Sequence, residues 1–338
     1  MITRIVTSLW AAAALASGAW AAEKNTLLNV SYDVAREFYE EYNALFIEQY
    51  KQKTGQAVKV NQSHAGSTKQ ARAVVDGLEA DVVTMNQTTD VDFIAERGRN
   101  LVVKDWRTKF PHNASPYTST MAIMVRKGNP KGIKDWDDLA KPGVGVVIPN
   151  PKTAGNGRYS YLAMWAFAKE KYGGDDAKIK ELLAGIFKNV PVLDTGGRGA
   201  TTTFVQRGIG DALLTFEAEI LTTIREAGAD KFEIVYPSQS VEAEMPVAIV
   251  ERIVDRHGTR QLATDYLNFL YAEPAQELIV KHFYRPRLES VASKHADKFG
   301  KLKLVKVDDA FGSWAQAQKT HFSEGGTFDQ IYAGRNKR

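Results

Sequence analysis

Four short segments combine small or hydroxyl-bearing residues with the expected start of a helix. They are residues 31–33, 63–70, 150–158 and 194–200. Small residues let backbone N–H groups approach a ligand closely, and the N-terminus of a helix carries a partial positive charge. Four helix N-termini that point into one cleft would therefore bind an anion, mainly through backbone N–H groups.

Ordinary helix capping is the competing explanation for these segments. Asp33 is a good N-cap residue, and Ser67 with Gln70 matches the S-x-x-Q capping box. A hydroxyl that accepts a hydrogen bond from a helix can still donate its own proton to an oxyanion. Glycine-rich turns alone are weak signals, but the same construction in all four segments favours an anion site.

The protonation of the anion decides which ligand suits such a site. Phosphate keeps a proton near neutral pH and benefits from a carboxylate acceptor, whereas sulfate is fully ionised and only accepts hydrogen bonds. A site made of donors alone leaves the phosphate proton unpaired, which costs free energy. Asp33 is the one carboxylate that we expect nearby, and we expect it to cap its helix. A carboxylate pointing at the ligand would reverse the preference for sulfate.

Strand-like and helix-like segments alternate along the chain. Strands are expected at residues 27–31, 57–60, 81–85, 144–148, 190–193 and 212–216. Helices are expected to begin at Asp33, at Ser67, near residue 157 and near residue 200, with another at residues 261–271. This order predicts an α/β fold with mostly parallel, doubly wound sheets, which bind ligands at the carboxyl ends of their strands.

Two longer strands are expected at residues 120–126 and 246–250. We interpret them as crossings between two lobes, which creates a hinge and a cleft. Lobe one would hold residues 22–118 and 244–338, and lobe two residues 119–243. Two lobes also suit a chain longer than the ~250–300 residues at which single cores usually stop growing.

The first 21 residues have the pattern of a cleavable secretory signal. Arg4 precedes an apolar run over residues 5–16, and Ala19-Trp20-Ala21 has the small-x-small pattern of a cleavage site. The run is shorter than the ~20 apolar residues that a membrane span needs. We therefore expect a soluble protein in the periplasm.

Charge and composition exclude several classes of protein. The formal net charge is +4, and basic and acidic residues are interspersed, which argues against a nucleic-acid-binding stripe. The chain has no cysteine, so disulfides, thiolate metal sites and cysteine nucleophiles are excluded.

The same loops carry a resemblance to a known family. The segments LLNVSYD (27–33), QSHAGS (62–67), NPKTAG (150–155) and DTGGRG (194–199) resemble the periplasmic sulfate- and thiosulfate-binding proteins of ABC importers. RKGNP (126–130) and GGTFD (325–329) fit the same family. The resemblance implies a class II periplasmic binding fold that captures the anion between two lobes and delivers it to a membrane permease for sulfur assimilation. It implies no cofactor, and we expect a monomer.

The resemblance also implies a set of neutral donors around the anion. These would be the N–H groups of Asp33, Ala154, Gly155, Asn156 and Gly197, together with the Ser67 hydroxyl. In such proteins, the arginines that correspond to Arg158 and Arg198 lie near the anion without needing to pair with it.

One position departs from the sulfate-binding branch. That branch has an indole N–H donor where this chain has Phe216, which cannot donate. Phe216-Glu217 and residues 195–203 are more similar to the thiosulfate-binding branch, where an apolar ring would suit a terminal sulfur. Core packing is the alternative role for Phe216. We therefore expect binding of both sulfate and thiosulfate.

An exported hydrolase is the competing class of function. The six histidines show no H-E-x-x-H spacing, and the chain has neither a G-x-S-x-G nor a G-x-x-x-x-G-K-[ST] motif. His64 lies near Ser67, but a turn histidine with a local hydrogen bond explains it better than a catalytic base. We therefore expect no enzyme and no metal site.

Two other ligands fit binding proteins of this general kind. Ferric iron would need a convergent tyrosine pair, and nothing in the spacing of Tyr32 and Tyr117 brings them together. Molybdate is a larger dianion that also carries no proton, and only the family motifs argue against it.

Overall fold

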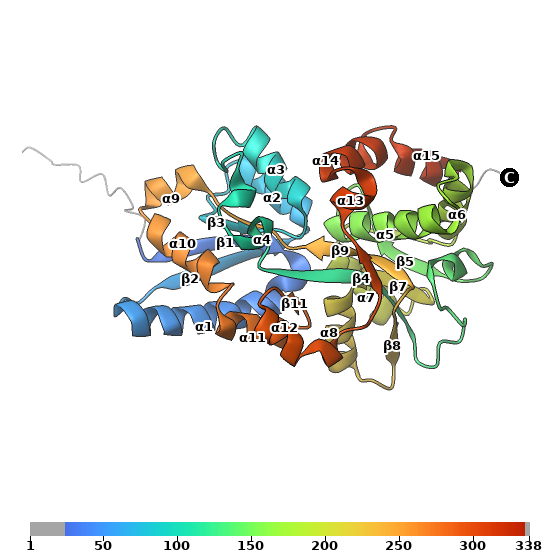
Figure 1. Ribbon diagram of the computed structural model, residues 1–338, viewed down its shortest axis with the longest axis horizontal. Coiled ribbons are helices and arrows are strands. Elements are labelled where there is room, and N and C mark those ends of the chain that lie inside the picture. Colours follow the sequence, from blue (N-terminus) through green and yellow to red (C-terminus); the bar gives the residue numbers. More distant parts are fainter. Residues whose placement is uncertain (1–23, 335–338) are drawn as a thin grey trace, which may run out of the picture.

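The computed structural model describes residues 24–334 and shows two α/β lobes side by side (Figure 1). The predicted signal at residues 1–21 lies outside the described residues. Within residues 24–334, no helix is both long and apolar enough to cross a bilayer.

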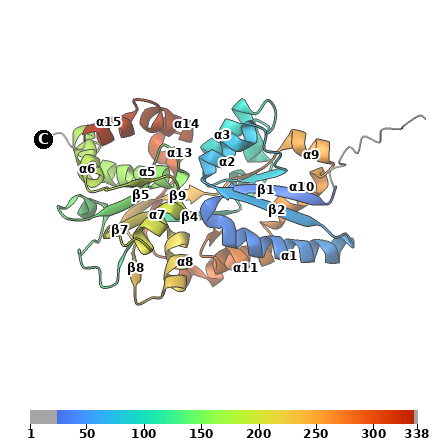
Figure 2. The same cartoon turned by 180° about the vertical axis from the view of Figure 1, so that it is seen from behind.

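The first lobe is built on a mostly parallel sheet. β1 (Thr26–Tyr32) pairs in parallel with β2 (Lys59–Ala65) and β3 (Val82–Thr84), and β10 (Val247–Ile249) pairs antiparallel with β3. The helices of this lobe are α1 (Arg36–Thr54), α2 (Ser67–Val75), α3 (Thr88–Arg97), α4 (Pro111–Ala114), α9 (Glu251–His257) and α10 (Arg260–Phe269). α1 covers one face of the sheet, and α2 and α3 cover the other (Figures 1 and 2). The predicted β–α–β order is confirmed here.

The second lobe contains a mixed sheet in the order β12-β9-β4-β7-β5-β6. The strands are β4 (Tyr117–Arg126), β5 (Val146–Pro149), β6 (Leu193–Asp194), β7 (Ala212–Phe216), β8 (Phe232–Val235), β9 (Gln239–Glu244) and β12 (Lys303–Val305). β5, β6 and β7 are mutually parallel, whereas β4 runs antiparallel to β7, β8 and β9. The helices that follow these strands are α5 (Gly155–Lys171), α6 (Asp176–Lys188), α7 (Gly197–Val205) and α8 (Glu217–Ala227).

Two neighbouring strands connect the lobes. The first part of β4 pairs with β9, with Thr118 opposite Glu244 and Thr120 opposite Glu242. The later part of β4 pairs with β7 and β8 inside the second lobe. After β9, the chain enters the first lobe through β10. The strand predicted as a crossing at residues 246–250 is β10 inside the first lobe, and β9, from Gln239, lies beside β4 as the second connecting strand.

The last helices pack against the second lobe, although we expected residues 244–338 to lie in lobe one. After α11 (Glu273–Lys281), β11 (Arg285–Pro286) and α12 (Glu289–Lys294), the chain continues into α13 (Val307–Phe311), α14 (Trp314–Ala317) and α15 (Thr327–Gly334). Figure 1 shows these three helices beside α5 and α6. Aromatic contacts explain the position, because Tyr161 of α5 packs on His321, Phe322 and Phe328.

A buried ion pair fixes the start of α8. Glu217 has no solvent exposure, and its carboxylate accepts from Nε of Arg285 at 2.7 Å and from Nη2 at 2.9 Å. Its Oε1 also accepts from the Gly300 N–H at 3.3 Å. Arg285 belongs to β11, so the pair joins α8 to a segment distant in the sequence.

Replacing Glu217 by Ala should lower the free energy of unfolding by about 3 kcal/mol or more, because it leaves the Arg285 charge without its buried partner. Urea denaturation measures the change. Glu170→Gln is the matched control: Glu170 pairs with Lys303 at the surface, where both side chains are more than half exposed. Its effect should stay within ~1 kcal/mol. Similar losses in both variants would contradict this interpretation.

Candidate functional site

Helices from both lobes begin at the seam between them. α2 comes from the first lobe, and α5 and α7 come from the second. The Thr153 hydroxyl, just before α5, donates to the carbonyl of Thr195, just before α7, at 3.3 Å. A methyl group on Gly66, just before α2, would lie 3.8 Å from the carbonyl oxygens of both Thr153 and Thr195. The loops before the three helices therefore meet.

The first turn of each helix presents N–H groups without a partner in the helix. In α5, the Arg158 N–H is bonded to the Ala154 carbonyl at 3.1 Å, which leaves residues 155–157 as the orphan donors. The same counting leaves the N–H groups of residues 67–69 in α2 and of Gly197 and Gly199 in α7, because the Arg198 N–H donates to Asp33. The seam between the lobes is thus rich in neutral hydrogen-bond donors.

The structure gives the predicted donor Ala154 another partner. Its N–H donates to the Asn150 carbonyl at 2.9 Å, because residues 150–153 form a tight turn before α5. Gly155, at the start of α5, is the first residue of this loop with an orphan N–H. At this loop, the N–H groups without a partner in the helix therefore begin at Gly155.

Ser67 does not form the predicted capping box. Gly66 is the N-cap of α2, without a side-chain cap, and the Gln70 amide donates to the Ser31 carbonyl at 3.2 Å. The Ser67 hydroxyl accepts from the Asn86 N–H at 3.3 Å and points its proton at the Met85 sulfur at 3.5 Å. A thioether is a weak acceptor, but a hydrogen bond from this hydroxyl also stabilises the buried Asp90 carboxylate and opposes the rise of its pKa with burial.

The Asp33 carboxylate reaches across the seam instead of capping only its own helix. Asp33 begins a short 3-10 turn, η1 (Asp33–Ala35), and its Oδ1 accepts from the Val34 N–H at 3.0 Å. Its Oδ2 accepts from the Arg198 N–H of α7 at 3.4 Å. Burial raises the pKa of this carboxyl above its ordinary value, against the opposing effect of these hydrogen bonds. Both oxygens therefore have protein donors.

Asn156 and Gly197 lie against each other and against the first lobe. The Asn156 amide nitrogen donates to the Thr215 hydroxyl at 2.8 Å, at the end of β7. A methyl group on Gly197 would lie 2.9 Å from that nitrogen and 3.1 Å from Cγ1 of Val34. A side chain here would force the Asn156 amide and Val34 to shift, so glycine suits the close approach of α5, α7 and η1.

Arg198 binds carboxylates on both sides of the seam. Its Nη2 donates to Glu37 of α1 at 2.8 Å, and its Nε lies 3.8 Å from Oε1 of Glu219 in α8. Burial lowers the pKa of Arg198, but Glu219 and Glu37 outweigh this effect, so the pKa is raised. Its charge is compensated by protein groups.

Arg158 lies buried behind the start of α5. Its Nε donates to the Pro151 carbonyl at 3.0 Å, and only 6% of the residue is exposed. Burial lowers its pKa, while the charge of Asp90 in α3 acts in the opposite direction. Arg158 therefore holds the loop before α5 and faces a carboxylate of the first lobe.

Phe216 belongs to the core. It is fully buried, and its ring meets that of Tyr159 edge-to-face at a centroid distance of 6.0 Å. It directly follows Thr215, the partner of Asn156. The structure thus supports the packing role that we considered for this residue.

Sequence reasoning missed Asn86 and Gln87, which follow β3. Both are buried, and Oδ1 of Asn86 and Oε1 of Gln87 have no hydrogen-bond partner within the described chain. A methyl group on Gly155 would lie 2.2 Å from Oδ1 of Asn86. Their place at the carboxyl end of a parallel strand was the signal that could have identified them.

Tyr32 and Tyr117 lie together, contrary to our expectation from their spacing. Their hydroxyls are 3.4 Å apart, and the Tyr39 hydroxyl lies 3.2 Å from that of Tyr117. Burial raises the pKa of each of these hydroxyls, which disfavours the phenolate that a ferric ion would need.

Among residues 24–334, no group of three or more His, Asp or Glu side chains could hold a metal ion. His64 does not lie in a turn as predicted: it belongs to β2, and its Nδ1 lies 2.9 Å from the carbonyl of Tyr32 in the neighbouring strand β1.

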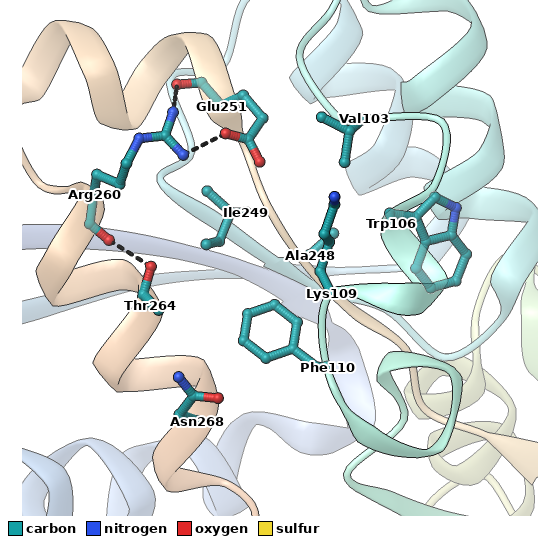
Figure 3. A pocket seen from close by; sticks show the side chains of 10 residues that line it. All are labelled: Val103, Trp106, Lys109, Phe110, Ala248, Ile249, Glu251, Arg260, Thr264 and Asn268. Atoms are coloured by element: carbon teal, nitrogen blue, oxygen red, sulfur yellow. Dashed lines mark hydrogen bonds and ion pairs between the residues drawn. The ribbon is translucent and has the colours of Figure 1, made fainter.

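Two cavities differ in their suitability for an anion. A cavity of about 510 Å³ lies at the seam and is lined by Asp33, Gly66, Thr153 and Gly196, among others. A second cavity, of about 420 Å³, lies inside the first lobe between Trp106, Phe110 and Ile249 (Figure 3). The cations of the second cavity already have carboxylate partners: Arg260 pairs with Glu251, and Lys109 with Asp105. The seam cavity is the better candidate by its charge, and of the predicted donors only Asp33 lines it.

The buried Glu219 should make stability depend on pH. Burial raises its pKa from 4.5 to about 7, against the opposing charge of Arg198. Between these values the folded protein holds a proton that the unfolded chain has lost, so the free energy of unfolding should fall as the pH rises. Glu219→Gln should reduce this fall by about 2–3 kcal/mol between about pH 5 and about pH 8, measured by urea denaturation. The exposed Glu181→Gln is the control, and equal pH profiles of wild type and Glu219→Gln would refute the assignment.

Comparisons with known proteins place the chain in a family. The family model described as "Bacterial extracellular solute-binding protein" matches residues 30–285. The chain is 52% identical to a thiosulfate-binding protein of Pseudomonas aeruginosa, over 98% of this chain and 99% of that protein. It is 53% identical to a sulfate-binding protein of Salmonella typhimurium, over 94% and 96%. A solved structure of a sulfate-binding protein from Mycobacterium tuberculosis H37Rv matches with a TM-score of 0.79 and 31% identity, over 88% of this chain and 100% of that one. These relatives are binding proteins rather than enzymes, and the chain belongs to the bacterial extracellular solute-binding protein family.

Proposed function

We propose that this protein captures sulfate and thiosulfate in the periplasm and delivers them to the permease of an ABC importer. The observation that carries the proposal is the meeting of the N-termini of α2, α5 and α7 at one seam, each with orphan N–H groups. Relatives that match nearly the full length are named as sulfate- and thiosulfate-binding proteins.

The proposed donors come from both lobes. The first lobe would supply the Asp33 N–H and the Ser67 hydroxyl, and the second the N–H groups of Gly155, Asn156 and Gly197. Ala154 would contribute through the turn that positions Gly155, because its own N–H already has a partner. The anion would then join the lobes.

The position of Asp33 favours an anion without a proton. Its two carboxylate oxygens accept from Val34 and Arg198 N–H groups, so its hydrogen bonding is directed at the protein. A phosphate proton would compete with those donors for an acceptor. Sulfate and thiosulfate carry no proton at neutral pH and avoid this conflict.

Contacts across the seam would couple binding to closure. The Glu37–Arg198 ion pair and the Asp33–Arg198 hydrogen bond both join the first lobe to α7. Rotation about β4 and β9 would break them and expose the N–H groups. The closed protein, acting as a monomer, would be the form that the permease recognises.

Isothermal titration calorimetry tests the choice of ligand. Sulfate and thiosulfate should both bind, and phosphate should bind about tenfold to hundredfold more weakly because its proton stays unpaired. Phosphate binding as tight as sulfate binding would overturn the account of a site made of donors alone. Molybdate binding tighter than either sulfur anion would instead support the alternative ligand.

Gly155→Ala should weaken sulfate binding at least about tenfold, because the new methyl group would lie 2.2 Å from Asn86 Oδ1 in the closed protein. The thermal midpoint should change little, since alanine suits the first turn of a helix. Gly334→Ala adds the same methyl group where no atom lies within 4 Å and serves as the control. Unchanged sulfate affinity in Gly155→Ala would show that the lobes do not close as described here.

A further inference from the structure

The mouth of the seam cavity carries a concentration of positive charge. Lys69 and Arg72 of α2 and Lys152 of the second lobe all line this cavity. Asp33 is the only carboxylate among the described residues that line it, and its oxygens already accept two N–H groups. Three cationic side chains and one carboxylate thus line this cavity, and Arg72 also lines a neighbouring cavity with Asp90, Asp92 and Glu96.

Lys69 and Arg72 differ from most cations of this protein. They lie one turn apart on α2 and are exposed, and neither side chain has an ion pair or hydrogen bond to any residue in the described part of the chain. Lys152 is different, because its Nζ donates to Asp329 at 2.8 Å and to the Ser323 carbonyl at 3.0 Å. The uncompensated charge at the mouth thus comes from Lys69 and Arg72.

We propose that Lys69 and Arg72 form an electrostatic collecting site that accelerates the entry of divalent anions into the seam without holding them afterwards. This inference rests on the proposed function. Exposed charges act on an approaching ion through water, and clefts lined by one sign of charge raise association rates. The bound anion would be held by the buried N–H groups, so its dissociation rate should not depend on these two side chains.

Coulomb's law sets the size of the effect. Two unit charges about 10 Å from a divalent anion in water change the association rate about tenfold at low salt. Screening reduces this change to about twofold at about 0.15 M salt. The dependence on ionic strength therefore distinguishes steering from direct contact.

The test compares the double variant Lys69→Gln/Arg72→Gln with the unchanged chain. The protein has no cysteine, so Ala315→Cys, on the exposed rim of the seam, gives one site for a fluorescent label in both proteins. Stopped-flow mixing with sulfate then measures association, and displacement by excess unlabelled protein measures dissociation. We expect association to slow about tenfold at low salt and about twofold at about 0.15 M, with dissociation unchanged.

Lys51→Gln/Lys53→Gln is the matched control. It removes the same charge from the last turn of α1, which extends away from the second lobe (Figure 1). Its association rate should stay close to that of the unchanged chain. Equal association rates in the double variant and this control would overturn the steering role, and so would a faster dissociation that accounts for the whole loss of affinity. Failure of the unchanged chain to bind either sulfate or thiosulfate in calorimetry would instead overturn the proposed function, together with the inference that rests on it.

Discussion

Buried backbone N–H groups need hydrogen-bond acceptors, and this requirement determines how the two lobes meet. The first turns of α2, α5 and α7 cannot satisfy their own donors, and the fold directs them at one seam. A buried donor without an acceptor costs free energy, so the closed arrangement favours an acceptor between the lobes. Glycine at positions 155 and 197 keeps side chains out of this place, where a Cβ atom would collide with Asn86 and Asn156. Closure and anion capture would therefore be two aspects of one event.

Full charges and partial charges have separate places in the protein. Arg198 is bound to Glu37 and lies close to Glu219, and the buried Arg158 lies where the charge of Asp90 acts on it. Because these arginines already have carboxylates nearby, the groups at the seam that would face an anion are neutral backbone N–H groups. An anion could bind to them without breaking an ion pair. The unpaired cations, Lys69 and Arg72, are exposed at the edge of the seam, where water screens their charges. Affinity and the speed of capture would thus depend on different residues.

Sequence patterns such as hydrophobic periodicity and helix-capping residues predicted the helices and strands, which depend on residues close together in the sequence. The start of α2 at Ser67 was predicted correctly, and those of α5 and α7 were two or three residues from their predicted positions. Side-chain partners across the seam were not predictable in the same way. Asp33 and Arg198 are 165 positions apart, and Tyr32 and Tyr117 are 85 apart, so no periodicity records their contact. The aromatic packing that carries α13–α15 to the second lobe is equally remote from any local pattern, because Tyr161 meets partners about 160 residues later.

The return of the last helices to the second lobe affects the order in which the chain can fold. During synthesis, the first residues of α5 emerge long before His321, Phe322 and Phe328, which cover Tyr161. Until those residues arrive, the second lobe exposes an apolar helix face that no earlier segment occupies in the finished structure. The protein therefore cannot complete this lobe as an independent unit while the chain is growing. Packing of the last segment therefore completes the folding of this lobe. A chain that lacks this segment would expose apolar surface and would be prone to aggregate.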